Sequence, residues 1–113
     1  MGKEILEKSS QTFMVVLLGE VPYLFVVSKI KNVHVNGKEY LAFPLSDPNV
    51  EIALSTDSRI YGLSFLQKEK KIFRFNGIGL VSKDEEILKK LEGKGVDFAV
   101  LLRIESFREE ELE

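Results

Sequence analysis

The stretch EYLAFPLSDPNVEIALS, residues 39–55, decides how the fold is built, because it holds two apolar runs separated by only a few residues. Glu39–Pro44 ends on the first apolar run and is typical of a β-strand. In Val50–Leu54 the large apolar residues alternate with smaller or charged ones, which predicts a second strand with one buried face. We therefore predict two strands joined by the short segment Leu45–Asn49.

Period-two patterns and β-branched runs continue on both sides of this stretch. They predict strands over Thr12–Leu18, Tyr23–Ile30, Ile60–Leu66, Ile72–Phe75 and Val96–Ile104. Asn36-Gly37 is a strong hairpin signal, because both positions accept positive φ, and it makes the second and third strands antiparallel neighbours. A second hairpin is expected across the charged tip Gln67–Lys71. Gly77-Ile78-Gly79 predicts a bulge of the kind that lets a barrel close.

Helical patterns are confined to two short segments. Lys3–Ser9 is compatible with a short helix, and a second helix is expected at about residues 84–92. Ser82 and Glu85 fit a capping box before it, and Ile87, Leu88 and Leu91 then form one apolar stripe.

Together these elements predict a mainly β protein, a six- to seven-stranded antiparallel barrel that is closed or nearly closed. A sandwich and an open sheet covered by helices are the alternatives. We expect a single domain over residues 1–108 and a charged, frayed C-terminal tail over residues 109–113.

Composition narrows the class of protein. A chain of 113 residues with 44% apolar residues suits one domain with a core of its own. The absence of cysteine favours a reducing compartment, hence the cytoplasm, and no apolar run reaches the ~20 residues of a membrane helix.

A net charge of −2 disfavours nucleic-acid binding. Abundant Glu and Lys, without Cys or Trp, point to a thermophilic source.

Catalytic constellations are missing from the sequence. The single histidine, His34, lies beside a predicted turn, so we expect no Ser-His-Asp triad, no multi-histidine metal site and no catalytic side chain. The acidic run at 109–113 does not fix the geometry of a metal site. The aromatic pairs Tyr61/Phe65 and Phe73/Phe75 could serve as a stacking platform for single-stranded nucleic acid, but period-two aromatics are more often core residues.

Four segments, taken in order, carry a resemblance to a known family. They are the run PYLFVV at Pro22–Val27, the Asn36-Gly37 hairpin, the segment LSDPNVEI at Leu45–Ile52, and FNGIGLV at Phe75–Val81 followed by an acidic helix start. Their order and spacing resemble the flavin-binding split-barrel family, which includes pyridoxamine phosphate oxidases and small FMN-binding proteins. The resemblance spans nearly the whole chain and implies a split barrel that binds FMN between two subunits of a homodimer.

The resemblance also implies where FMN would be held. Family members carry a helix between strands three and four, whose start meets the phosphate, and in this sequence we expect that helix to be shortened or lost. The remaining candidates for cofactor binding are Ser28, Lys29, Lys31, Ser55, Thr56 and Arg59. Two functions stay open. One is an FMN-binding protein that transfers hydride or electrons as an oxidoreductase; the other is a homodimeric structural or interaction module without a cofactor.

Overall fold

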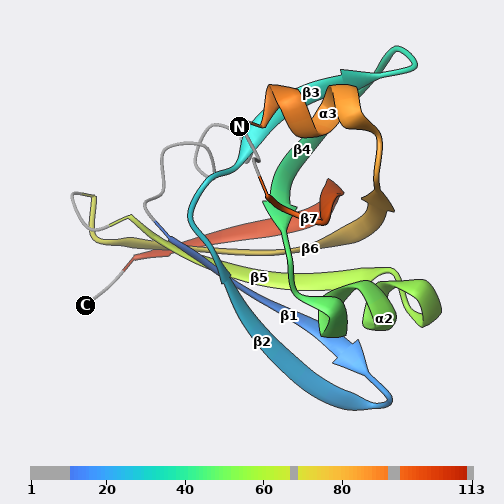
Figure 1. The fold of residues 1–113 in the computed structure, drawn as a ribbon. Helices are drawn as coiled ribbons and strands as arrows, with labels where there is room; N and C mark the ends of the chain where they lie inside the picture. Colours follow the sequence, from blue (N-terminus) through green and yellow to red (C-terminus); the bar gives the residue numbers. More distant parts are fainter. Residues whose placement is uncertain (1–10, 67–68, 92–94, 112–113) are drawn as a thin grey trace.

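The computed structural model describes residues 11–66, 69–91 and 95–111, and it confirms a mainly β fold (Figure 1). Seven antiparallel strands form one sheet in the order β2-β1-β5-β6-β7-β4-β3. The strands are β1 Thr12–Leu18, β2 Val21–Val27, β3 Lys31–Val35, β4 Lys38–Leu45, β5 Arg59–Leu66, β6 Lys71–Ser82 and β7 Phe98–Glu111; the helices are α2 Pro48–Thr56 and α3 Glu85–Lys90. The helix expected at Lys3–Ser9 lies outside the described residues.

The hairpin predicted at Asn36-Gly37 is confirmed, with φ angles of 52° and 77° at its two central residues. It joins β3 to β4, whereas the strand predicted over Tyr23–Ile30 ends at Val27. The prediction that the second and third strands are neighbours was therefore wrong for β2 and β3. These two strands lie at opposite ends of the strand order, so the barrel is split between them.

One face of the curved sheet encloses the main core. Its largest fully buried side chains include Phe43, Phe73 and Phe98, and α2 adds Val50, Ala53 and Leu54 to the same cluster. A second, smaller core lies on the other face of the sheet, beneath α3. It consists of Val33, Ala42, Ile87, Leu91, Ala99 and Leu101. Figure 1 shows α3 beside β3 and β4, and α2 near β1 and β5.

The strand predicted over Val50–Leu54 was wrong, because this segment is helical. Asp47 caps α2 by accepting a hydrogen bond from the Asn49 backbone N–H at 3.0 Å, and Pro48 occupies the first turn, where a missing N–H costs nothing. Val50, Ala53 and Leu54 are buried while Ile52 is 57% exposed. That spacing is helical, so the helix that was expected to be shortened or lost is present as a nine-residue helix between β4 and β5.

Two further boundaries differ from the sequence prediction. The N-cap of α3 is Asp84, which accepts from the Glu86 backbone N–H at 2.9 Å, and Ser82 instead accepts from the Asp84 N–H. β7 runs through Glu111, which pairs with Lys71, so the chain from Glu109 to Glu111 belongs to the sheet rather than to a frayed tail. The predicted bulge is confirmed by a register shift between Asn76 and Gly77.

Candidate functional site

An exposed apolar surface covers the outer side of β2, β1 and β5. Side chains alternate along each of these strands, so residues between the buried positions point away from the core. We call this surface the outer apolar face; its members are Phe13, Val15, Leu24, Val26, Tyr61, Leu63 and Phe65. Leu24 is 61% exposed, and Tyr61 and Phe65 are about 40% exposed.

The strand register makes this surface continuous. Phe13 lies opposite Val26 on one side and opposite Leu63 on the other. Val15 lies in the same way between Leu24 and Tyr61. Directly opposed residues on neighbouring strands share a face and are about 5 Å apart, so these six side chains form two adjoining rows.

An aromatic contact extends the surface along β5. The rings of Phe13 and Phe65 pack edge to face, with centroids 6.2 Å apart. The interpretation of Tyr61 and Phe65 as core residues was wrong, because both side chains are exposed. The second aromatic pair, Phe73 and Phe75, is buried as predicted. The inward positions of β5 are taken instead by Ile60, Gly62 and Ser64.

Arg59 is the predicted site residue that lies on this surface. It begins β5 two residues before Tyr61, so its exposed side chain belongs to the same side of the sheet. A guanidinium beside a flat apolar surface can hold an anionic group while the surface accepts an aromatic ring. The described residues thus place one cation at the border of an apolar surface.

Ser28 and Lys29 lie in the connection after β2, and Lys31 begins β3. They follow β2 at the end where Val27 pairs with Thr12, and Thr12 pairs with Ser64. Ser64 is five residues after Arg59, or roughly 17 Å along the strand. Within one subunit, the six predicted residues therefore form two separate groups.

The hydroxyl groups of Ser55 and Thr56 are already used within α2. Ser55 Oγ donates to the Ile52 carbonyl at 2.6 Å, and Thr56 Oγ1 donates to the Ala53 carbonyl at 3.1 Å. A phosphate needs donors, so these two hydroxyls are poor candidates as they stand.

The start of α2 does not fit a phosphate either. The Asp47 carboxylate occupies the position where an anion would bind, accepting from the Asn49 N–H at 3.0 Å and from the Tyr23 hydroxyl at 2.6 Å. Pro48 has no N–H, and Glu51 adds a second negative charge in the first turn. The helix implied by the family resemblance is present, but the Asp47 carboxylate already occupies its N-terminus.

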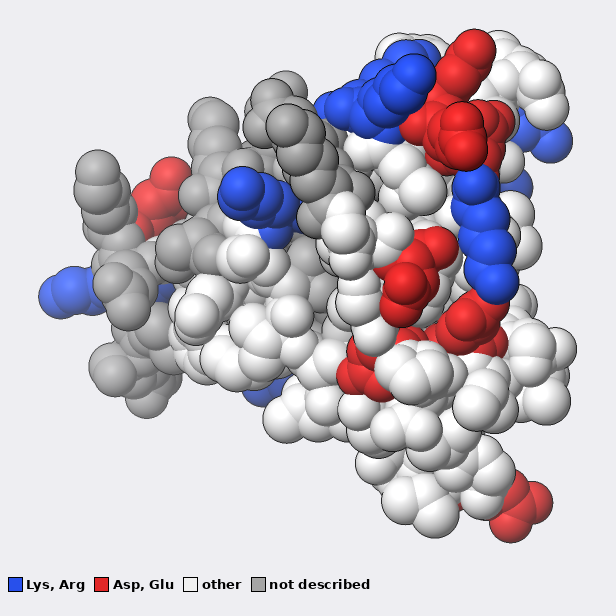
Figure 2. All heavy atoms as spheres, in the orientation of Figure 1, with Lys and Arg blue, Asp and Glu red and all other residues white. Residues whose placement is uncertain are grey.

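Acidic side chains gather between α2 and α3 on the face shown in Figure 2. Lys83 spans part of this region and forms an ion pair with Glu51 at 2.9 Å. The hydrogen bond to Glu51 and the attraction of its charge, with a smaller contribution from Asp97, raise the pKa of Lys83. The pair links α2 to the segment before α3.

Metal binding finds no support in the part of the chain that the structure describes. No group of three or more His, Cys, Asp or Glu residues there is arranged to hold a metal ion. His34 is an exposed residue of β3, as a hairpin position predicts. Over the same described ranges, no helix is long and apolar enough to cross a membrane.

Known proteins resemble this chain in structure rather than in sequence. No protein-family model and no curated protein matches the sequence. Among solved structures, a variant of HupZ from Group A Streptococcus is similar with a TM-score of 0.74 and 8% identity, covering 96% of this chain and 95% of that one.

Two further solved structures are similar to this chain over most of its length. A candidate pyridoxamine 5′-phosphate oxidase from Listeria innocua has a TM-score of 0.65 and 16% identity, covering 93% of this chain and 91% of that one. General stress protein 26 from Bacillus anthracis has a TM-score of 0.63 and 10% identity, covering 97% of this chain and 91% of that one. The chain has the split-barrel fold of pyridoxamine 5′-phosphate oxidase-like proteins.

Sequence reasoning missed the outer apolar face as a site. The signal was available in β5, where Tyr61, Leu63 and Phe65 alternate with a glycine and a serine. Tyr61, Leu63 and Phe65 form one side of the strand, and Ile60, Gly62 and Ser64 form the other. Because either side could face the core, the alternation alone does not reveal which one is exposed.

Proposed function

We propose that two copies of the chain pair through the outer apolar face and that FMN binds at this interface, with Arg59 holding the phosphate. The observation that carries the proposal is a continuous apolar surface with an arginine on its border, in which Leu24, Val26, Tyr61 and Phe65 are exposed and Phe13, Val15 and Leu63 are half-buried. An isolated subunit would leave this surface in water, and a twofold interface would bury it twice. When bound, FMN supplies hydride or electron transfer, which fits a chain whose sequence offers no catalytic constellation.

In this proposal the residues of the chain bind and orient the cofactor. The apolar rows around Val15 and Tyr61 accept a flat ring and exclude water, and Arg59 contributes a planar, permanently charged donor. Lys29 and Lys31 of one subunit are the remaining cations near the other end of the face.

Titration of FMN into the purified protein tests the proposal. We expect saturable quenching of flavin fluorescence, and we expect Arg59→Ala to weaken binding by about tenfold, the loss of one charge-assisted hydrogen bond. Lys38→Ala is a matched control, since it removes one exposed cation at the β3–β4 hairpin, outside the outer apolar face. Equal affinities for the parent and the Arg59→Ala variant would remove Arg59 from the phosphate role.

A second candidate is a homodimeric interaction module without a cofactor. It is favoured by the acidic N-terminus of α2, which opposes phosphate binding at the helix. A dimer that shows no fluorescence change at high protein concentration would support this function over FMN binding.

A further inference from the structure

A cluster of hydrogen-bond donors lies on the outer side of β6 and β7, beyond the outer apolar face. Arg74 of β6 lies directly opposite Arg108 of β7, and Asn76 lies opposite Ser106. All four side chains are exposed. Because Arg74 and Asn76 are two residues apart on one strand, the two pairs form adjacent rows about 7 Å apart. We call these four residues the β6–β7 donor cluster.

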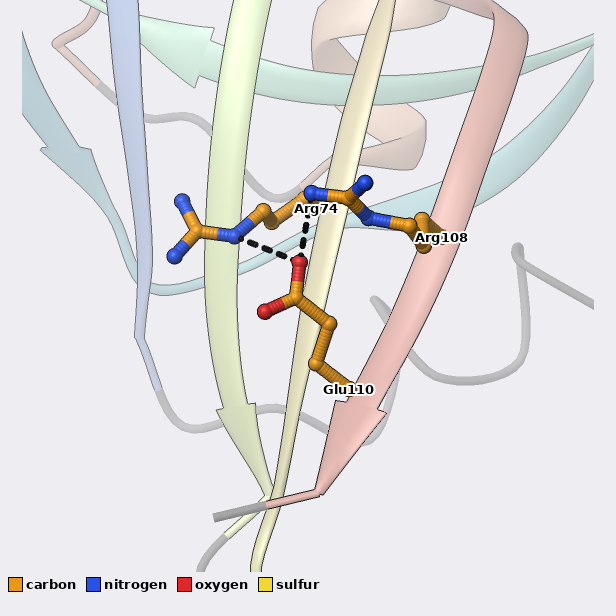
Figure 3. A network of polar contacts seen from close by, with 3 residues as sticks. All are labelled: Arg74, Arg108 and Glu110. Carbon is orange, nitrogen blue, oxygen red and sulfur yellow. Dashed lines mark hydrogen bonds and ion pairs between the residues drawn. The ribbon is translucent and has the colours of Figure 1, made fainter.

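The two arginines are held together by one carboxylate (Figure 3). Glu110 Oε1 accepts from Arg74 Nε at 3.1 Å and lies 2.7 Å from Arg108 Nη2. The arginine side chains remain 51% and 74% exposed. Like charges placed opposite each other on neighbouring strands are destabilising, and Glu110 offsets part of this repulsion.

Charge and geometry both favour an anionic ligand. Two guanidinium groups against one carboxylate leave the group with one net positive charge. Arg74 uses only its Nε in the contact with Glu110, and its two terminal nitrogens, which point away from Arg108 in Figure 3, can donate to another acceptor. The guanidinium fork matches the oxygens of a phosphate, and Asn76 and Ser106 add neutral donors beside it.

We propose that the β6–β7 donor cluster binds the phosphate group of a small-molecule ligand, with Glu110 as an internal competitor for the two arginines. The proposal goes beyond FMN binding, because it concerns a different part of the sheet and needs no flavin. Leu63, the β5 neighbour of Arg74, places this cluster at the border of the outer apolar face.

The test uses the flavin-free full chain and NMR signals of the arginine side-chain N–H groups during titration with inorganic phosphate. Ionic strength is kept constant with chloride, because surface electrostatics are screened by salt. We expect saturable shifts at Arg74 and Arg108. Arg108→Gln should weaken phosphate binding by about tenfold, equivalent to one hydrogen bond to a charged group. Arg103→Gln, another exposed arginine of β7, is the control and should bind like the parent.

Glu110→Gln separates a binding site from a structural ion network. Removing the competing carboxylate should tighten phosphate binding by about threefold or more, since it frees both guanidinium groups and removes one negative charge. Equal or weaker binding in this variant would overturn the proposal. So would shifts that do not saturate and that affect Arg103 as strongly as Arg108. Because each signal reports one arginine, neither outcome depends on whether FMN binds near Arg59.

Discussion

Leu24→Asp on β2 should separate the proposed dimer into monomers. A fully buried leucine contributes about 1.5–3 kcal/mol, and Leu24 is 61% exposed, so its burial in an interface is worth roughly 1–2 kcal/mol. A twofold interface counts each substitution twice, which gives roughly 2–4 kcal/mol per dimer, or about 30- to 1,000-fold in the dissociation constant. Desolvation of the new carboxylates would add to this loss.

Sedimentation velocity over a range of protein concentrations measures the effect. Ile52→Asp is the matched control, because Ile52 is 57% exposed on α2, outside the outer apolar face. We expect the control to sediment like the parent and Leu24→Asp to shift to the mass of one 12.9 kDa chain. If both variants sediment like the parent, the dimer does not use this face.

Three further predictions concern the barrel itself. In Gly62→Ala the new Cβ would lie 1.9 Å from Phe75 Cζ, so urea unfolding should show a loss of about 1–3 kcal/mol in the free energy of unfolding. Phe75→Leu in the same chain should recover part of this loss, and an unchanged stability of Gly62→Ala would contradict the prediction. Thr12→Val leaves the buried Ser64 hydroxyl without its 2.6 Å partner and should lower the free energy of unfolding by about 1–3 kcal/mol. Adding Ser64→Ala should recover part of this loss, and additive losses in the double variant would count against the pairing. The pKa of Lys83 is raised above 10.5, so its ion pair should be fully formed below that pH and lost as the pH rises through the raised value; an NMR titration that gives an ordinary pKa would contradict this.

The strand framework could be predicted from sequence because periodicity and turn chemistry agreed there. Asn36-Gly37 and the glycines around Ile78 fixed a hairpin and a bulge, and the structure contains both. Fold recognition followed from the order of these elements rather than from any one motif.

The segment Val50–Leu54 shows why the helical part of the fold was harder to predict from the sequence. Its apolar residues suit both a strand and a helix, and a nine-residue element is too short for periodicity to decide. The deciding signal was local: Asp47-Pro48 is an N-cap followed by a first-turn proline. The same local chemistry at Asp84, rather than Ser82, begins α3.

The candidate site was only partly predictable, because it depends on which face of each strand is covered. Arg59 could be proposed from residue type alone, but only the structure shows that Tyr61, on the same side of β5, faces away from the core. The failure of Ser55 and Thr56 as phosphate donors depends on hydrogen bonds within α2 that no sequence pattern specifies.

Native mass spectrometry of the purified chain titrated with FMN tests the central claim most directly, because one spectrum reports both assembly and bound flavin. The account predicts a dimer of the 12.9 kDa chain that gains FMN in a saturable way. A monomer that remains free of flavin at every FMN concentration would contradict it.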